Sequence, residues 1–502
     1  MSSSAEPQRL HPVAMLLDLL RSIRGWFSVT SLPWLFVAFR DGIDLSSIGF
    51  LLVLIVVSVV ASAVWGMLSW RATLYSIEGN SFRFRRGVLG RNERTIPLDH
   101  IQSVDIVQGV IQRIFNVVEV RIETAGGGGS GRGEADVSLP AVSRPVAAEL
   151  QRSLAPRRGG TVAVAQPDAG VLTVEVPEAP QPVLIRRLSM GRLLLAGATS
   201  GQIGIVLPLI ATFSQLFDDV LTPEFVMRFA QEQGWLPNSV AVAVLLAFGV
   251  LLLAWLIAIA GAVLAFAGFT LSREGDSLRI QRGLIERREV TIPINRIQAV
   301  QTVENIFRQP FGMVLVRMES AGYGANAGVS TTLFPLLARA EVESFLKAAA
   351  PEFAVSPPLQ SLPRRALRRY VIRSALPALL LAALAVSLLV WRGLSELAIV
   401  PLSLVLLGGA YGWLRFKGVG WSVDRDHLVV RYRTLARTMA IAPRRRLQSR
   451  SFAQSPFQRR VGLATFSAQV GRGLNLEVVD MEATDAEDAL YRLGPTSAPS
   501  QH

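Results

Sequence analysis

The fold is decided by a stretch that the chain contains twice. It reads TIPLDHIQSVDIVQGVIQRIFNVVEVRIETAG at residues 95–126 and TIPINRIQAVQTVENIFRQPFGMVLVRMESAG at residues 291–322. The two align without a gap and are identical at about 14 of 32 positions. A third, more divergent copy reads IAPRRRLQSRSFAQSPFQRRVGLATFSAQVG at residues 441–471. Self-similarity at this level predicts one structural unit that is present three times.

Three positions recur in every copy: a proline, then an aliphatic residue, then a glutamine. They are Pro97, Ile101 and Gln102 in the first copy, Pro293, Ile297 and Gln298 in the second, and Pro443, Leu447 and Gln448 in the third. We expect the aliphatic residues to face the core. The glutamines either satisfy a neighbouring backbone group or line a ligand surface.

Around this stretch, short alternating runs are separated by Gly-Asn and Gly-Asp turns, a pattern typical of antiparallel strands. Each copy then ends in a segment with the signals of a helix. About seven strands and one helix in roughly 85 residues favour a small antiparallel barrel or sandwich, with the helix covering an open end.

Hydrophobic segments precede each copy in pairs. A membrane-spanning helix needs about 20 apolar residues, and six segments are candidates. They are residues 26–39, 48–70, 193–213, 240–269, 370–391 and 397–414. The sequence therefore predicts three helix pairs that alternate with three β-rich modules.

The positions of the charges predict the orientation in the membrane. The formal net charge is +13, which nucleic acid or an anionic membrane surface could explain. The arginines cluster beside the hydrophobic segments, for example at residues 364–373, whereas the short loop at residues 214–239 is acidic. This is the positive-inside pattern. It favours a membrane over nucleic acid, and it predicts that the termini and the modules are cytosolic.

Few residues offer catalytic or metal chemistry. The chain has no cysteine and four histidines, which show no metal-ligand spacing. Residues 126–131 read G-x-G-x-x-G, but a strand is expected after them, so we interpret them as a hairpin loop. We found no catalytic set, and we expect no cofactor, no metal and no enzyme activity.

Basic residues are the candidate contacts with lipid headgroups or with a partner. They are Arg113 in the first copy and Arg444, Arg445, Arg446, Arg459 and Arg460 in the third, and Arg308 of the second copy falls in the same loop as Arg113 and Arg459. Arginines next to a span could hold lipid phosphates. A solvated basic face is the alternative.

A helix pair followed by I-P-x-x-x-I-Q-S-V, then Q-R and V-x-V-x-x-A-G, resembles the bacterial membrane-flanked PH-like domain family of the YdbS/YdbT type. Three units in 502 residues resemble its larger, three-module members. The third copy departs from the pattern at Ala442, Leu447 and Val461. The resemblance implies α-helical transmembrane pairs plus three PH-like barrels, each closed by a C-terminal helix.

The expected boundaries follow from the repeats. Helix pairs cover residues 15–71, 185–268 and 367–416, the modules cover 72–156, 269–350 and 417–494, and linkers cover 157–184 and 351–366.

The expected function is a non-catalytic, multi-pass inner-membrane platform for interaction or assembly, with membrane lipids as one partner. The resemblance also implies a smaller one-module membrane partner, and a role in envelope protection or in resistance to membrane-active compounds. A transporter or a lipid-modifying membrane enzyme is the alternative. The predicted spans contain no carboxylate or histidine of the kind that marks proton-coupled transport.

Overall fold

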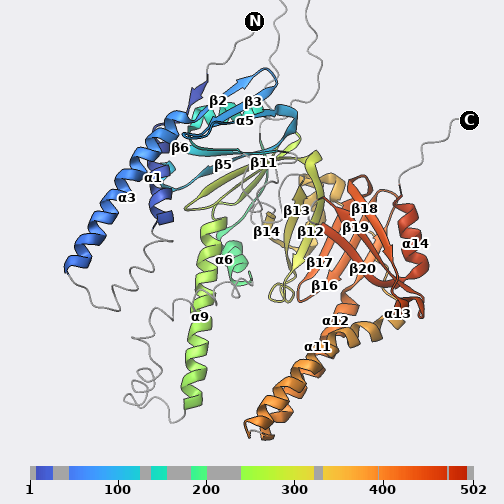
Figure 1. The fold of residues 1–502 in the computed structure, drawn as a ribbon. Helices are drawn as coiled ribbons and strands as arrows, with labels where there is room; N and C mark the ends of the chain where they lie inside the picture. The colour runs from blue at the N-terminus through green and yellow to red at the C-terminus, as the bar shows by residue number, and fades with distance from the viewer. Residues whose placement is uncertain are drawn as a thin grey trace, which may run out of the picture. The chain divides into compact units, whose positions relative to one another are not determined.

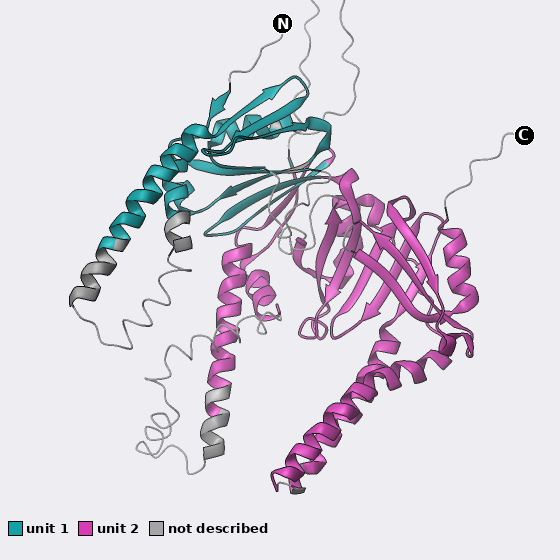
Figure 2. Cartoon of the chain, viewed as in Figure 1, with its two compact units in different colours: residues 1–182, 277–292 teal, residues 183–276, 293–502 magenta. Residues whose placement is uncertain are grey.

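The computed structural model describes residues 7–26, 45–124, 137–154, 182–200, 239–320, 332–393, 395–471 and 474–494 (Figure 1). The chain divides into two compact units, residues 1–182 with 277–292 and residues 183–276 with 293–502 (Figure 2). Part of the second copy, residues 277–292, thus belongs to the same unit as the first copy. The glycine-rich segment at 126–131 lies outside the described residues.

Four of the described helices contain a stretch long and apolar enough to cross a membrane. They are α3 (Leu45–Ala72), α9 (Ser239–Phe266), α11 (Arg364–Trp391) and α12 (Ile399–Gly418), at four of the six predicted spans. Residues 27–39 of the first predicted span lie outside the described residues. The third, 193–213, is described only at its start, where α6 (Met190–Ala198) ends with Thr199 as its C-cap. Residues 201–213 of this predicted span lie outside the described residues.

Glycines let the two helices of a pair approach closely. A Cβ on Gly412 of α12 would lie 2.6 Å from the carbonyl oxygen of Tyr370 and 2.8 Å from the Cα of Val371, both on α11. Gly197 of α6 is similarly close to Ile259 of α9, whose Cα would be 3.1 Å from a Cβ. Small residues at such crossings allow backbone contact between membrane helices.

Replacing Gly412 with alanine is therefore expected to destabilise the third helix pair by about 1–3 kcal/mol, because the methyl group has no room beside the α11 backbone. Thermal unfolding of the detergent-solubilised protein measures the loss. Gly409→Ala is the matched control, since a Cβ there meets only Val371 Cγ1, at 3.9 Å. An equal loss in both variants would show that the close crossing is not the cause.

Each module contains three strands, a 3-10 turn, three more strands and a helix. Module 1 comprises β2 (Leu74–Glu78), β3 (Ser81–Arg86), β4 (Asn92–Pro97), η2 (Leu98–His100), β5 (Ile101–Gln108), β6 (Val117–Thr124), β7 (Val137–Ser143) and α5 (Arg144–Leu154). Module 2 comprises β9 (Thr270–Glu274), β10 (Ser277–Arg282), β11 (Arg287–Pro293), η3 (Ile294–Arg296), β12 (Ile297–Glu304), β13 (Met313–Ser320), β14 (Thr332–Ala338) and α10 (Val342–Ala349). Module 3 comprises β15 (Gly420–Val423), β16 (His427–Arg433), β17 (Arg437–Pro443), η7 (Arg444–Arg446), β18 (Leu447–Ala453), β19 (Leu463–Val470), β20 (Leu474–Glu482) and α14 (Ala483–Arg492).

A further strand of each module comes from the chain before its helix pair. β1 (Gln8–Arg9) pairs with β2, β8 (Val183–Arg187) pairs with β9, and Gln360 forms a bridge to β15. Arg9, Arg186 and Gln360 lie opposite Leu74, Leu271 and Trp421, which are equivalent in the three copies. Each helix pair is thus inserted after the first strand of its module, so segments expected to be terminus, linker or the start of a helix pair belong partly to the modules.

The sheets are open, so the predicted closed barrels are not found among the described residues. In the first unit β1-β2-β3-β4 form one sheet, and β5 at the edge of β7-β6-β5 pairs with β11 of the second copy. In the second unit β14-β13-β12-β17-β16-β15 form one sheet and β18-β19-β20 another. Strand edges that would have to meet to close a barrel pair with the neighbouring module instead.

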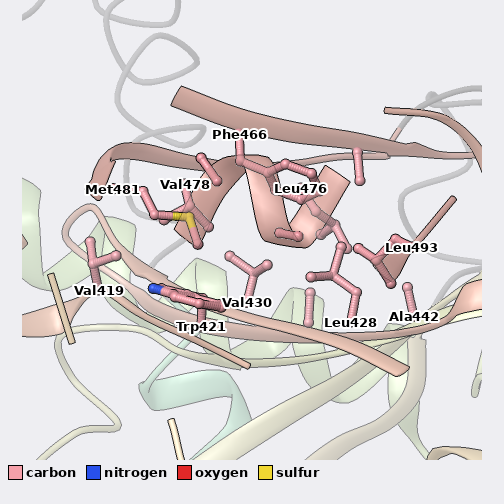
Figure 3. Packing of buried hydrophobic residues seen from close by; sticks show 14 of the residues in the cluster. Val419, Trp421, Leu428, Val430, Ala442, Phe466, Leu476, Val478, Met481 and Leu493 are labelled. Carbon is pink, nitrogen blue, oxygen red and sulfur yellow. The ribbon is translucent and has the colours of Figure 1, made fainter. Parts of the chain in front are cut away.

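In modules 1 and 3 the core lies between the two sheets of the module, and α14 adds to it in module 3. Figure 3 shows Phe466, Leu476 and Val478 from β19 and β20 facing Leu428 and Val430 of β16. The recurring Ile101 and Ile297 are 1% and 0% exposed, whereas Leu447 is only partly buried. The prolines before them stand as N-caps of the 3-10 turns that lead into the second sheet.

Candidate membrane-facing surface

One loop has the same construction in all three modules. We call it the tip loop: residues 109–116 between β5 and β6, 305–312 between β12 and β13, and 455–462 between β18 and β19. It contains a short helix in modules 1 and 3, α4 (Val110–Ile114) and α13 (Pro456–Arg459). It ends in a left-handed residue, Asn116, Gly312 or Gly462, with φ of 53°, 59° and 64°. Asn and Gly tolerate that conformation best, so the same turn enters the next strand each time.

A buried polar side chain holds each tip loop. It is Gln112, Arg308 or Gln458, each less than a tenth exposed. In modules 1 and 3 the glutamine Oε1 accepts a hydrogen bond from the first backbone N–H of the loop, Gly109 N at 2.7 Å and Ser455 N at 2.9 Å. In module 2 this position is Arg308, whose side chain bonds to α6 and to Pro335.

Arg308 connects module 2 to its helix pair. Its guanidinium donates from Nη2 to Ala196 O at 3.2 Å, from Nε to Thr199 Oγ1 at 3.1 Å and from Nη1 to Pro335 O at 3.2 Å. Asn305 Nδ2 donates to Thr199 O. Arg308 and Asn305 thus donate to acceptors at the C-terminal end of α6. The last carbonyl groups of a helix lack partners within the helix, and this end favours a cation. Burial, together with the nearby charge of Arg317, lowers the pKa of Arg308 to about 10, so it stays charged at neutral pH.

In module 3 the connection runs through Asp480. Its carboxylate is 2% exposed, and its Oδ1 accepts from Arg369 Nε of α11 at 2.9 Å and from Gln458 Nε2 of the tip loop at 2.9 Å. A second ion pair joins Arg365 and Glu482. Asp480 has φ of 58°, which is uncommon for a residue with a side chain. The tip loop is therefore fixed against α6 in module 2 and against α11 in module 3.

Large apolar side chains are exposed on all three tip loops. The set is Val110, Ile114 and Phe115 in module 1, Ile306, Phe307 and Phe311 in module 2, and Phe457 and Val461 in module 3, with exposed fractions from 39% to 72%. A second exposed set occupies the turn before the β4, β11 and β17 strands, at Leu89, at Leu284 and Ile285, and at Leu435. Clustered exposed apolar residues mark surfaces that contact a membrane or another protein.

The tip loop of module 2 lies level with Trp255 of α9. The acceptors of Arg308 and Asn305 flank Ala198, whose carbonyl accepts from Trp255 Nε1 of α9 at 3.0 Å. α9 has 28 residues, and the hydrocarbon core needs about 20. Any 20-residue stretch of α9 includes Trp255. Ile306, Phe307 and Phe311 therefore project from a loop that is held beside the end of α6, level with Trp255 of α9.

The sequence matches the family described as "Bacterial PH domain" three times, at residues 27–158, 226–352 and 371–493. The chain belongs to the bacterial PH domain family. Each match begins within a helix pair and ends at or just after the terminal helix of a module, so the helices and the bacterial PH domain form one repeating unit.

The chain is similar along its length to a curated relative, the "UPF0699 transmembrane protein YdbT" of Bacillus subtilis (strain 168). The two are 32% identical over 510 residues, which cover 97% of this chain and 98% of the relative. No solved structure matches the chain.

The arginines predicted as contacts lie in two separate places in the third bacterial PH domain. Arg459 and Arg460 are exposed on the tip loop and line a hollow of about 340 Å³ with Gln454 and Pro456. Arg444 and Arg445, in η7, line a cleft of about 640 Å³ with Glu352, His427 and Gly494, and Arg445 pairs with Glu352 at 2.6 Å. η7 and the tip loop stand at opposite ends of β18, a seven-residue strand and thus about 20 Å long.

The remaining predicted residues are scattered. Arg113 is exposed on the first tip loop, beside Ile114, whereas Arg308 is buried and cannot belong to an exposed basic surface. Arg446 is partly buried. The side chain of Gln102 lies outside the described part of the structure. Gln298 Oε1 is buried without a hydrogen-bond partner among the described residues, and Gln448 is exposed. The three glutamines therefore do not share one environment.

The signal that sequence reasoning missed is a polar residue that recurs at the same position of every tip loop. Gln112, Arg308 and Gln458 occupy the same position of the ungapped repeats. Reading the arginines of this loop as one basic group concealed that Arg308 aligns with the two glutamines.

Proposed function

We propose that the chain is a non-catalytic membrane protein whose helix pairs hold three bacterial PH domains against the inner leaflet, as a platform for interaction and assembly. The observation that carries the proposal is the tip loop of module 2, fixed at the depth of Trp255 by Arg308 and presenting Ile306, Phe307 and Phe311. Each such side chain would gain about 1.5–3 kcal/mol on leaving water for the leaflet.

The charges beside these loops support the same arrangement. Arg459 and Arg460 lie between Phe457 and Val461 in the sequence, so apolar side chains could enter the leaflet while the cations remain at lipid phosphates. The cytosolic position of the modules and of both termini rests on the positive-inside distribution of arginines. The smaller one-module partner and a role in envelope protection rest on the family resemblance.

Fluorophores on single cysteines test the position of the tip loops, since the natural chain has no cysteine. We expect a nitrobenzoxadiazole probe at Phe311→Cys or Phe457→Cys, in the full chain reconstituted into anionic liposomes, to be quenched by nitroxides on the lipid acyl chains. The same probe at Arg425→Cys is the matched control and should be quenched only by aqueous iodide.

Arg425 suits this comparison because it is exposed at the opposite end of β16 from α12. Arg431, near the other end of that strand, donates to Gly418 O at the end of α12, at 3.1 Å. If the tip-loop probes respond to iodide as strongly as the control does, the modules do not rest on the leaflet through these loops, and the proposal is wrong.

A further inference from the structure

Consecutive modules are joined edge to edge by the same strand pairing. β5 of module 1 pairs antiparallel with β11 of module 2, with Val104 opposite Thr291. β12 of module 2 pairs antiparallel with β17 of module 3, with Val300 opposite Ile441. Val104 and Val300 are equivalent in the repeats, as are Thr291 and Ile441. The two joints therefore have the same register, and each covers five residue pairs.

The strands that would continue this row stand unpaired on one edge at each end of the chain. β18 is the module 3 equivalent of β5 and β12, and it ends the sheet β18-β19-β20. β4 is the module 1 equivalent of β11 and β17, and it ends the sheet β1-β2-β3-β4. Among the described residues no strand pairs with the outer edge of either. Five of the six residues of β4 are exposed, all except Ile96, whereas Val290 and Ala440, the equivalents of Arg94, are buried.

Neither free edge has a proline at one of the five joined positions. Pro97 of β4 stands where the paired strands have Pro293 and Pro443, outside the five joined positions. β4 differs from β11 in charge at two joined positions, where Asn92 and Arg94 replace Arg288 and the buried Val290. Glu93 is held by Arg85 of its own hairpin at 3.1 Å, as Glu289 of β11 is held by Arg279 at 2.5 Å. A row of unpaired backbone groups of this kind is a template for another strand.

The end of each joint also has complementary side chains. Arg287 lies opposite Gln108 in the first joint, and Arg437 lies opposite Glu304 in the second, with 3.7 Å between Nη1 and Oε2. The equivalent residues on the free edges are Arg91 and Gln454. An arginine would thus meet a side-chain oxygen at the same position for a third time.

We infer that β4 of one copy of this chain docks antiparallel on β18 of a second copy, in the register of the two internal joints, so that copies associate head to tail. Ser451 would lie opposite Arg94, and Gln454 opposite Arg91. Such an interface is heterologous and generates rings or open rows. It extends the row of modules from one chain to the next, and it does not depend on whether the tip loops touch lipid.

Disulfide formation between two differently tagged chains tests the joint. One population carries Ser451→Cys and the other Arg94→Cys, and both are co-expressed in the same membrane and oxidised. The matched internal control is the double variant Gln301→Cys with Ala440→Cys, which are the equivalent positions and lie directly opposite each other in the second joint. We expect a shift from monomer to a dimer that carries both tags, with a yield comparable to that of the internal disulfide. Ser451→Cys mixed with Asn92→Cys, which is two residues out of register, should form little disulfide-linked dimer.

Placing Ser451→Cys and Arg94→Cys in one chain should give a ladder of multimers or a closed ring. The inference is overturned if the internal control forms and the mixed dimer does not. It is equally overturned if Ser451→Cys joins only to itself, if the double variant forms only an internal disulfide, or if Ser451→Cys joins only to a different protein. If no mixed dimer forms but the tip-loop probes are quenched by lipid nitroxides, the proposed membrane platform stands and only the association between copies is rejected.

Discussion

Replacing Arg308 with alanine is expected to lower the free energy of unfolding of the second unit by about 3–4 kcal/mol, a large loss for one side chain. The substitution removes the donors of three hydrogen bonds to Ala196 O, Thr199 Oγ1 and Pro335 O. Arg308 is 6% exposed, so water cannot replace it freely and these acceptors remain without partners. Thermal unfolding of the solubilised protein, followed by tryptophan fluorescence, measures the loss.

Two further variants separate the causes. Arg308→Gln introduces the residue of modules 1 and 3, whose amide can cap its own tip loop but is too short to reach α6. We therefore expect an intermediate loss. Arg317→Ala removes an exposed cation of the same module that disfavours the charge of Arg308, and it should leave stability unchanged or slightly higher. If Arg308→Ala unfolds at the temperature of the natural chain, the contact between module 2 and α6 contributes no stability.

The repeats and four of the spans could be predicted from the sequence because their signals are local and long. An ungapped repeat over residues 95–126 and 291–322 requires one fold for both copies, and an uncharged run such as α9 has few soluble alternatives. The terminal helices and the number of strands in a module could be predicted for the same reason. All of these features depend on period and composition within a single segment.

The origin of the first strand could not be predicted. β1 has two residues, which is too short to show a period of two, and β8 lies in a region whose composition reads as linker. Their pairing with β2 and β9 spans a whole helix pair in the sequence. Long-range pairing of this kind leaves no mark on local composition, so the modules were expected to begin only after the helices.

The open sheets escaped prediction for a related reason. A barrel satisfies the edges of a sheet within one module, and nothing in one copy of the repeat indicates that a neighbour could satisfy them instead. The pairing of β5 with β11 and of β12 with β17 is visible only when copies are considered together. Because every copy has the same strands, the terminal copies also have edge strands of the kind that pair in the internal joints, namely β4 and β18.

Replacing Asp480 with alanine is expected to cost about 3–4 kcal/mol, because it leaves the Arg369 cation and the Gln458 amide of module 3 without their common acceptor. Arg369 is 27% exposed and Asp480 2%, so solvent can compensate only the arginine in part. Asp480→Gly removes the same acceptor, but glycine adopts φ of 58° without strain. Its free energy of unfolding should therefore be about 1 kcal/mol higher than that of Asp480→Ala. The difference between the two variants measures the backbone strain separately from the lost contacts.

Asp480→Asn should lose least, about 1–2 kcal/mol, since asparagine tolerates the left-handed conformation and keeps one side-chain oxygen for Gln458 or Arg369. Asp488→Ala is the control. Asp488 pairs with Arg492 at 2.6 Å on the surface of α14, where both side chains are more than half exposed, and such pairs contribute about 0–1 kcal/mol. The loss of stability should thus decrease in the order Asp480→Ala, Asp480→Gly, Asp480→Asn and Asp488→Ala. This order is expected if the Asp480 carboxylate fixes the tip loop of module 3 to α11. If Asp480→Ala behaves like Asp488→Ala, the tip loop is held by its apolar contacts alone, and the buried carboxylate does not couple the module to its membrane helix.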